Sequence, residues 1–269
     1  MARKWIVRHG SMRLMGEFDP VQSTYAKGSK VILETPRGLE TGEILCESNE
    51  ETLKWILEPT TGKIIREITP QDSLKIEQNK KLEAKALETC ARFSAKRGLQ
   101  LAMVDVEALF GSERIIFYYL SEIRIDFREL VKDLAREFQT RIEMRQIGIR
   151  DEAKLLADFG DCGKPVCCNS HMIEMPPVSM KMARMQKATL DPAKISGRCG
   201  RLKCCLRFEQ DVYDDHQIDL PEPGSLITTQ KGKGRVLAQE ILSRRLLVEF
   251  EDGRKISILH SEVLDVSSN

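Results

Sequence analysis

A nine-residue pattern occurs twice in the second half of this 269-residue chain, and it limits the fold more than any other feature. Both copies read G-x-C-G-(K/R)-x-x-C-C, the first from Gly160 to Cys168 and the second from Gly197 to Cys205. Six of the chain's eight cysteines lie in these copies: Cys162, Cys167, Cys168, Cys199, Cys204 and Cys205. Packing cysteines do not repeat together with their glycines and basic neighbours, so we expect these six to hold a metal centre.

The donor set leaves the type of metal centre open. Thiolates are soft ligands that suit zinc, copper(I) and iron–sulfur clusters. Because neighbouring side chains tend to diverge, a four-cysteine zinc site would use Cys162, Cys199 and one cysteine of each adjacent pair. An iron–sulfur cluster is larger and fits an arrangement of many thiols, although three cysteines per copy is one short for a four-iron cluster. The other copy or a partner would then supply the fourth ligand.

Charge and glycine support a ligand role for the repeat. The glycine after each first cysteine allows a tight backbone turn and leaves amides free to point at sulfur. Basic side chains beside the thiols offset the negative charge of a thiolate-bound metal. Four residues supply this charge: Lys164, Arg198, Arg201 and Lys203. His171 follows Cys168 by three residues, but the sulfur ligands suffice without it. Cys46 and Cys90 lie outside the repeat, and we expect both in the core.

A thiol redox enzyme is the alternative in which a cysteine reacts. The spacing is not C-x-x-C, and no thioredoxin-like βαβ unit precedes it. We also find no phosphate-binding loop, no recognisable Ser-His-Asp set and no paired-carboxylate motif. The sequence therefore favours a non-catalytic protein.

Composition indicates the compartment and limits the partners. No apolar run approaches the roughly 20 residues that span a bilayer, and the first ten residues do not form a targeting segment. We therefore expect a cytoplasmic protein, where thiols stay reduced and eight cysteines do not imply four disulfides. The net charge of +1 gives no whole-chain argument for nucleic acid. From Arg141 to Arg207, however, 13 basic residues face 7 acidic ones, so RNA or an acidic partner remains a candidate.

The pattern along the chain predicts an α+β protein in four parts. Residues 1–70 form a β-rich module, with a hairpin from Lys30–Thr35 and Leu39–Cys46 around Pro36-Arg37-Gly38. Further strands are expected at Leu53–Leu57 and Lys63–Ile68. Residues 71–147 form an α-β-β-α-β layer. Its expected elements are a helix at Lys80–Lys96, strands at Gln100–Val106 and Arg114–Leu120, a helix that starts at Asp126, and a strand at Arg141–Ile147.

The other two parts follow. Residues 148–220 form a cysteine-rich metal-binding segment of the same core domain, with one short helix expected at Val178–Ala188. Residues 221–269 form a small barrel-like tail. Four strands are expected there: Gly224–Thr229, Arg235–Gln239, Arg244–Phe250 and Arg254–Leu259.

Several of these segments resemble one family. They are the two copies of the repeat, Gly148-Ile-Arg-Asp-Glu-Ala-Lys154, Ser179-Met-Lys-Met-Ala-Arg-Met-Gln186, Lys194-Ile-Ser-Gly197 and the early hairpin with Arg37-Gly-Leu-Glu40. The chain is similar to the bacterial stage 0 sporulation protein YaaT (RicT) family, whose members carry the C-terminal domain named after the yeast polymerase suppressor protein. The resemblance covers most of the chain and is looser in the tail.

The resemblance implies a cytoplasmic regulatory or adaptor subunit that is not an enzyme. It implies 4Fe–4S clusters held by Cys162, Cys167, Cys168, Cys199, Cys204 and Cys205, all of which this chain keeps. It also implies small helical protein subunits and an endoribonuclease as partners, in a complex that assists messenger RNA maturation and developmental regulation. A zinc-stabilised nucleic-acid-binding module is the alternative that needs no such complex.

Overall fold

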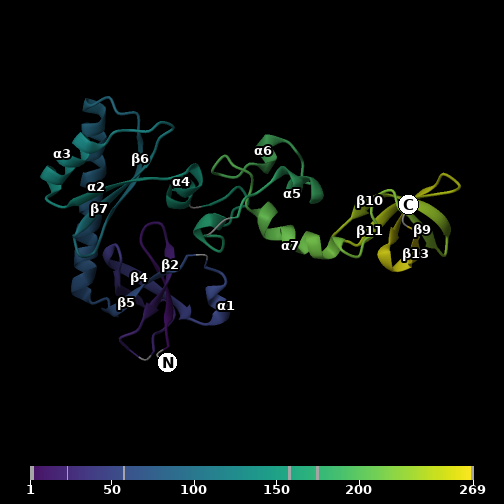
Figure 1. The fold of residues 1–269 in the computed structure, drawn as a ribbon, viewed down its shortest axis with the longest axis horizontal. Helices are drawn as coiled ribbons and strands as arrows, with labels where there is room; N and C mark the ends of the chain where they lie inside the picture. The colour runs from purple at the N-terminus through teal and green to yellow at the C-terminus, as the bar shows by residue number, and fades with distance from the viewer. Residues whose placement is uncertain (1–2, 23, 57, 157–158, 174–175, 268–269) are drawn as a thin grey trace. The chain divides into compact units, whose positions relative to one another are not determined.

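The structure is a computed structural model that describes residues 3–22, 24–56, 58–156, 159–173 and 176–267. The described part of the chain is a mixed α/β protein with several separate sheets (Figure 1). It divides into two compact units. The first comprises Met1–Met175 and Arg198–Arg201, and the second comprises Pro176–Gly197 and Leu202–Asn269.

The first unit begins with a closed five-stranded barrel of order β1-β2-β5-β3-β4. Its strands are β1 (Trp5–His9), β2 (Leu14–Asp19), β3 (Lys30–Thr35), β4 (Gly38–Glu47) and β5 (Thr60–Glu67). β2 and β5 run parallel, and the other neighbours are antiparallel. The predicted hairpin around Pro36-Arg37-Gly38 is confirmed as β3 and β4.

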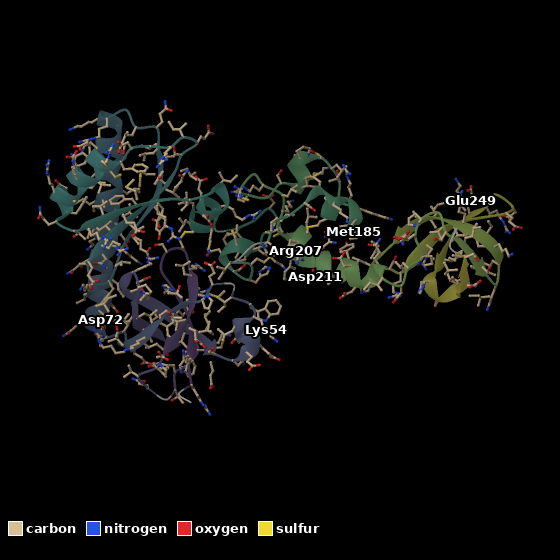
Figure 2. The ribbon with its side chains drawn as sticks, in the orientation of Figure 1. Lys54, Asp72, Met185, Arg207, Asp211 and Glu249 are labelled. Atoms are coloured by element: carbon tan, nitrogen blue, oxygen red, sulfur yellow. The ribbon has the colours of Figure 1, made fainter. Side chains whose placement is uncertain are left out.

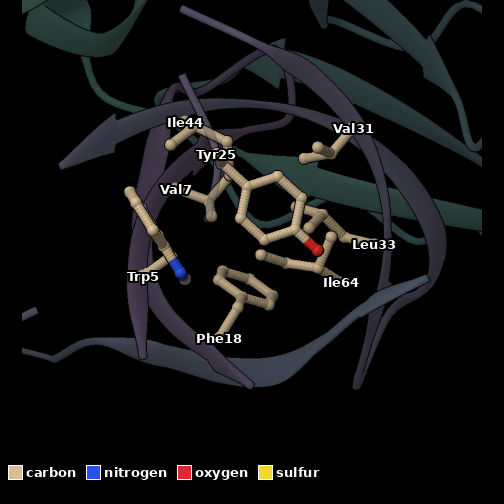
Figure 3. Packing of buried hydrophobic residues seen from close by; sticks show 8 residues of the cluster. All are labelled: Trp5, Val7, Phe18, Tyr25, Val31, Leu33, Ile44 and Ile64. Carbon is tan, nitrogen blue, oxygen red and sulfur yellow. The ribbon is translucent and has the colours of Figure 1, made fainter. Parts of the chain in front are cut away.

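Alternate residues of the barrel strands fill its interior (Figure 3). Period-2 alternation sends one set of side chains inward from every strand. The inner set from the strands is Trp5, Val7, Phe18, Val31, Leu33, Ile44 and Ile64, and Tyr25, between β2 and β3, packs with it. The Trp5 and Tyr25 rings meet edge to face, with 5.4 Å between their centroids. The barrel therefore has a packed apolar core.

The strand expected at Leu53–Leu57 is wrong. The chain instead forms the short helix α1 (Glu50–Leu53), and the described residues 54–56 are not in a strand. Asn49 explains the difference: its side chain accepts from the Thr52 amide, while the Thr52 hydroxyl accepts from the Asn49 amide. This reciprocal capping box favours a helical turn at this point over an extended strand. Leu57 lies outside the described residues.

An α+β layer completes most of the first unit. Helices α2 (Pro70–Lys96) and α3 (Arg128–Phe138) pack on a sheet of order β6-β7-β8 (Figure 1). Its strands are β6 (Ala102–Ala108), β7 (Arg114–Leu120) and β8 (Arg141–Gln146). The helix side chains Ala86 and Cys90 are fully buried against this sheet, as their helical spacing predicts. The expected helix–strand–strand–helix–strand order is thus observed.

Helix α2 starts ten residues earlier than the sequence pattern suggested. Thr69 is its N-cap and Pro70 its first residue, an arrangement that Pro favours because its missing N–H needs no partner there. Asp72, labelled at the start of the helix in Figure 2, accepts from the Thr69 amide and pairs with Arg66. The hydrogen bonds from Arg66 and Thr69 lower the pKa of Asp72 well below its usual range. α3 begins at Arg128, later than the expected start at Asp126. Phe127 is its N-cap, and the Asp126 side chain accepts from the Arg128 amide.

The turn between β1 and β2 is fastened into the α+β layer. The Ser11 amide donates to the Glu107 carboxylate at 3.0 Å. Met12 is buried in a cluster that includes Tyr118 and Ile147. Arg13 donates to the carbonyl of Asn169 at 3.0 Å. The barrel, the sheet and the first cysteine segment are therefore joined within the first unit. α4 (Ile149–Leu156) and η1 (Cys167–Asn169) complete that unit.

The described residues of the second unit form three α-helices and a sheet. Its helices are α5 (Met180–Met185), α6 (Pro192–Ile195) and α7 (Cys205–Gln217). α5 is shorter than the expected helix at Val178–Ala188, because Ser179 caps it and it ends before Lys187, whose φ is +51°. α7, which the sequence analysis did not identify, packs against α5.

The end of the second unit is a five-stranded sheet of order β12-β11-β10-β9-β13. Its elements are β9 (Leu226–Thr229), β10 (Gly232–Glu240), β11 (Arg245–Phe250), β12 (Lys255–Leu259), η2 (His260–Glu262) and β13 (Val263–Ser267). Four of the strands match the prediction. The fifth, β13, was missed, and it pairs antiparallel with β9. Leu246, Val248 and Ile258 are buried in its core.

Candidate metal centre

The two copies of the repeat form the same local structure. In the first copy, Phe159 and Pro165 are joined by a single antiparallel β-bridge. Ser196 and Leu202 hold the equivalent positions of the second copy and are bridged in the same way. The sequence repeat is therefore also a structural repeat, with each bridge closing a loop around the first cysteine of its copy.

The glycine after that cysteine has the same unusual conformation in both copies. Gly163 has a φ of +74° and Gly200 a φ of +73°. A Cβ at either position would meet no heavy atom within 4 Å, so free space is not what selects glycine there. The left-handed backbone conformation selects glycine, because any other residue in that conformation costs about 1–2 kcal/mol. The tight turn inferred from the sequence is confirmed.

Backbone hydrogen bonds close the first loop. The Gly163 amide donates to the Gly160 carbonyl at 3.0 Å, and the Gly160 amide donates to the Lys164 carbonyl at 2.9 Å. Gly160 also lies close to the cysteine: a Cβ at this position would be 3.6 Å from the Cys162 sulfur. The loop thus presents Cys162 from a compact turn whose backbone groups are already paired.

The adjacent cysteine pair of each copy lies at the start of a helical turn. Cys167 and Cys168 open η1, and Cys204 is the N-cap of α7, whose first residue is Cys205. The Phe208 amide donates to the Cys204 carbonyl at 3.0 Å. The start of a helix carries partial positive charge from its unpaired amides. Negative charge on sulfur at the start of α7 is therefore stabilised by the helix.

Three of the six cysteines have their sulfur atoms close together. The sulfurs of Cys167, Cys204 and Cys205 all lie within 4.8 Å of one another, and all three residues are half-buried. They come from both copies of the repeat. Among the described residues this is the one group of at least three cysteine, histidine or acidic side chains that could hold a metal ion.

The spacing and chemistry of this group fit a metal. Two sulfurs bound to one zinc ion at about 2.3 Å each, in tetrahedral geometry, are about 3.8 Å apart. Sulfurs within 4.8 Å of one another therefore need to move closer by at most about 1 Å to share one ion. Three thiolates leave one position of a four-coordinate metal to a further ligand. Both members of the Cys204–Cys205 pair belong to the group, which differs from the one-per-pair arrangement expected for zinc.

The other three repeat cysteines lie outside this group. Cys162 is exposed, Cys199 is half-buried and Cys168 is buried. His171 also lies outside it, and its Nδ1 is 3.1 Å from the Ser170 hydroxyl. Of the two cysteines beyond the repeat, Cys90 is buried as expected, and burial raises the pKa of its thiol to about 11. Cys46 is exposed, so its expected core position is wrong.

The start of α7 is held by side chains of its own unit. The Gln186 amide donates to the Leu206 carbonyl at 2.6 Å and to the Gln210 side chain at 3.1 Å. Gln210 in turn donates to the sulfur of Met185, which is labelled in Figure 2, at 2.9 Å. The Lys203 amide donates to the Ile195 carbonyl at 2.8 Å. These contacts fix the backbone that carries Cys204 and Cys205.

The surroundings of the cysteines are positively charged and partly apolar. Lys164, Arg198 and Arg201 are exposed beside their cysteines. Arg207 pairs with Asp211 at 2.7 Å on α7, where Figure 2 labels both. A pocket of about 630 Å³ adjoins Cys199 and is lined in part by Ile149, Leu156 and Phe159. These three side chains are exposed, which is unusual for a group of large apolar residues.

Helix α7, which carries Cys205, and the side chains that hold this helix in place were not predicted from the sequence. A signal was present: neither glycine nor proline occurs between Cys204 and Leu220, and Leu206, Gln210 and Tyr213 recur at helical spacing. The role of Gln186 had no comparable signal, because its contact with Leu206 depends on how α5 and α7 pack.

Comparison with known proteins identifies the class. Residues 62–147 match the PSP1 C-terminal conserved region, and residues 177–220 match the third domain of PSP1-like proteins. The second match contains the second copy of the cysteine repeat. The chain is therefore a protein with PSP1-type domains.

One relative shows the family more closely. The chain is 43% identical over 239 residues to stage 0 sporulation protein YaaT of Bacillus subtilis (strain 168), which covers 89% of this chain and 86% of that protein. This chain belongs to the YaaT family, as its motifs indicated. It is also 37% identical over 82 residues to the uncharacterized protein PB7E8.02 of Schizosaccharomyces pombe, covering 30% of this chain and 11% of that protein. No solved structure matches. In the described part of the chain, no helix has the length and apolar character to cross a membrane.

Proposed function

We propose that this chain is a non-catalytic regulatory subunit that binds an iron–sulfur cluster through the cysteine repeat and presents a metal-dependent surface to protein partners. The observation that carries the proposal is the convergence of Cys167, Cys204 and Cys205, three sulfurs from two copies of one motif, within 4.8 Å. The family fits this proposal, since the chain shares 43% identity with a protein named for sporulation.

The repeat offers enough ligands for a cluster. Cys167, Cys204 and Cys205 would bind three corners, and one of Cys162, Cys168 or Cys199 would bind the fourth. A bound iron–sulfur cluster supplies one-electron chemistry and a structural cross-link between the residues that hold it. Lys164, Arg198 and Arg201 offset the negative charge of the thiolates, and the start of α7 does the same through its amides.

The regulatory part of the proposal follows from the position of the ligands. Cys162, Cys167 and Cys199 lie on short turns with few buried side chains of their own, so binding of metal would contribute much of the local order there. Loss of the cluster would then release the ordered surface around the repeat. We infer that small helical subunits bind this surface in the cytoplasm, and that the complex assists an endoribonuclease in messenger RNA maturation.

An absorbance spectrum of anaerobically purified protein, with analysis of iron, sulfide and zinc, tests the proposal. A brown protein with broad absorbance and equal amounts of iron and sulfide is the expected result. The matched control for ligand variants is Cys46→Ser, because Cys46 is an exposed cysteine outside the repeat. Cys204→Ser should lose iron and the binding of partner subunits, and Cys46→Ser should keep both. An iron-free variant that still forms the complex would rule out a metal-dependent surface.

A zinc-stabilised nucleic-acid-binding module is the second candidate, and one observation favours it. Sulfurs within 4.8 Å of one another need to move only slightly closer to share one ion, whereas a four-iron cluster would need them to move apart. This candidate predicts a colourless protein with one zinc per chain and no sulfide. It also predicts an affinity for RNA that falls steeply with added salt, because phosphate contacts release counterions. Absent or salt-independent RNA binding would exclude it.

A further inference from the structure

A second pocket lies in the first unit, and no cysteine lines it. Its volume is about 420 Å³, within the range of about 300–1,000 Å³ typical of small-molecule sites. The barrel strands β1, β3 and β4, the turn after β1, helix α2 and the end of β6 all contribute to its wall.

The floor of the pocket is a buried network of charges. Glu40 and Glu107 both line the pocket, and both are ion-paired to Arg37, at 3.2 and 2.5 Å. His9 donates from Nδ1 to the Glu40 carboxylate at 2.9 Å, and the Tyr118 hydroxyl donates to Glu107 at 2.6 Å. The two acidic groups of the floor are thus already paired with basic or hydroxyl groups.

Gly10, which has no side chain, leaves the floor of the pocket open. Gly10 lines the pocket, and a Cβ there would lie 3.0 Å from the Glu107 carboxylate and 3.4 Å from the Arg37 amino group. That amino group, Nη1 of Arg37, and Nε2 of His9 are buried atoms for which the described residues provide no hydrogen-bond partner. Of these two residues only His9 lines the pocket, so the floor offers one buried ring nitrogen that has no partner among the described residues.

Four basic and four acidic side chains line the pocket, and three of the basic ones are left without an ion-pair partner among the described residues. Arg8 is ion-paired with Glu43 at 2.8 Å, so the charges of these two side chains offset each other. Arg13, Lys30 and Lys80 also line the pocket, and none of the three is in an ion pair with a carboxylate of the described residues. They come from three separate elements: the turn after β1, β3 and α2.

Arg13 and Glu83 of the pocket lining each contact the backbone of another segment. Arg13 has a φ of +49°, a conformation that bulky residues avoid, and its side chain donates to the Asn169 carbonyl at 3.0 Å. Glu83 lies among the lining residues and accepts from the Ala108 amide at 2.9 Å. Burial, with Asp105 and Glu107 nearby, raises the pKa of Glu83 to about 7, so it adds little negative charge below neutral pH.

We infer that this pocket binds a small phosphate-bearing molecule no larger than a mononucleotide, with Arg13, Lys30 and Lys80 contacting the phosphate. Lysine and arginine are the side chains that bind phosphate through charge-assisted hydrogen bonds. The size of the pocket suits a single nucleotide and excludes a larger folded ligand. The inference does not depend on the metal centre or on the regulatory role proposed above.

Calorimetric titration of the full chain with inorganic pyrophosphate and with adenosine 5′-monophosphate tests the inference. Both probes should bind wild type. Lys30→Ala and Lys80→Ala should each weaken binding about tenfold, the effect of losing one charged hydrogen bond. Both side chains are exposed, so neither change should disturb the fold.

Lys81→Ala is the matched control. Lys81 is the next residue of α2, is exposed, and does not line the pocket. Its affinity for both probes should stay within twofold of wild type. The inference is overturned if neither probe binds at millimolar concentration, if Lys81→Ala weakens binding as much as Lys80→Ala, or if only an RNA oligomer binds.

Discussion

Arg37 lies between two buried carboxylates of the first unit. The side chains of Glu40 and Glu107 are 2% and 9% exposed, and Arg37 pairs with both. Burial alone would raise the pKa of Glu40, but the hydrogen bond and charge of His9, followed by the charge of Arg37, lower it. A carboxylate that stays ionised in the interior depends on such partners, because burying an unpaired charge is costly.

Arg37→Ala should therefore be strongly destabilising. Removing one partner of a buried ion pair costs about 3–5 kcal/mol, since it leaves an uncompensated charge. Chemical denaturation followed by tryptophan fluorescence measures the change, because Trp5 is buried in the barrel. Arg3→Ala is the control: Arg3 pairs with Glu47 at 3.3 Å but is 68% exposed, so its loss should change stability little. Equal effects of the two substitutions would show that the network contributes no more than a surface pair.

Glu83 should give the first unit a pH-dependent stability. Its pKa is raised to about 7 from an ordinary 4.5, mainly by burial, with contributions from Asp105 and Glu107 that Lys80 and the Ala108 amide oppose. Between these two values the folded chain keeps a proton that the unfolded chain has lost. The free energy of unfolding therefore falls as pH rises from about 4.5 to about 7.

Glu83→Gln tests this dependence. The variant should equal wild type in stability near pH 4, where both side chains are neutral, and should be the more stable of the two at pH 8. Denaturation midpoints at the two pH values measure the difference. A variant that loses as much stability as wild type between pH 4 and pH 8 would contradict the assignment to Glu83.

At the scale of the element, the turn of each repeat should be needed for metal binding. Gly163→Val places a β-branched side chain in a left-handed backbone, which costs about 1–2 kcal/mol and opens the loop around Cys162. Gly28→Val is a matched control, because Gly28 also has a positive φ, +87°, and no atom within 4 Å of its added Cβ. Metal content per chain should fall in Gly163→Val and stay at the wild-type value in Gly28→Val. A fall in both variants would assign the effect to general destabilisation.

The elements that the sequence predicted have strong local patterns. The β3–β4 hairpin, the α2 stripe with Ala86 and Cys90, and the strands of the α+β layer follow from periodicity and turn residues. The Leu53–Leu57 strand failed because the Asn49 capping box overrode an extended pattern. The order of the closed barrel could not be predicted, since the parallel pairing of β2 with β5 joins segments about forty residues apart.

Three of the six cysteines expected from the sequence come together in the structure, and their arrangement was not predicted. The repeat named all six cysteines, and the structure shows that both copies form the same bridged turn. Which sulfurs come together depends on the tertiary fold, and the group of Cys167, Cys204 and Cys205 includes both members of one adjacent pair. The reason lies in α7: Cys204 caps the helix and Cys205 begins it, an element that the sequence analysis had not assigned.

At the scale of the whole molecule, loss of the metal should loosen only the segments that carry the cysteines. The barrel has its own apolar core, and so does the C-terminal sheet, whereas the cysteine turns bury few large side chains. Hydrogen exchange after removal of the metal should therefore speed up in residues 159–173 and 198–208. Exchange in β1–β5 and in β9–β13 should be unchanged. Equal acceleration throughout the chain would mean that the metal supports the entire fold.

The central claim is that both copies of the repeat serve one metal centre, and the metal content of single-cysteine variants tests it most directly. Cys167→Ser in the first copy and Cys204→Ser in the second should each remove nearly all bound metal, while Cys46→Ser should keep the wild-type amount. Retention of half the metal in each repeat variant would mean that the copies bind separate ions. Full retention in both would contradict the claim.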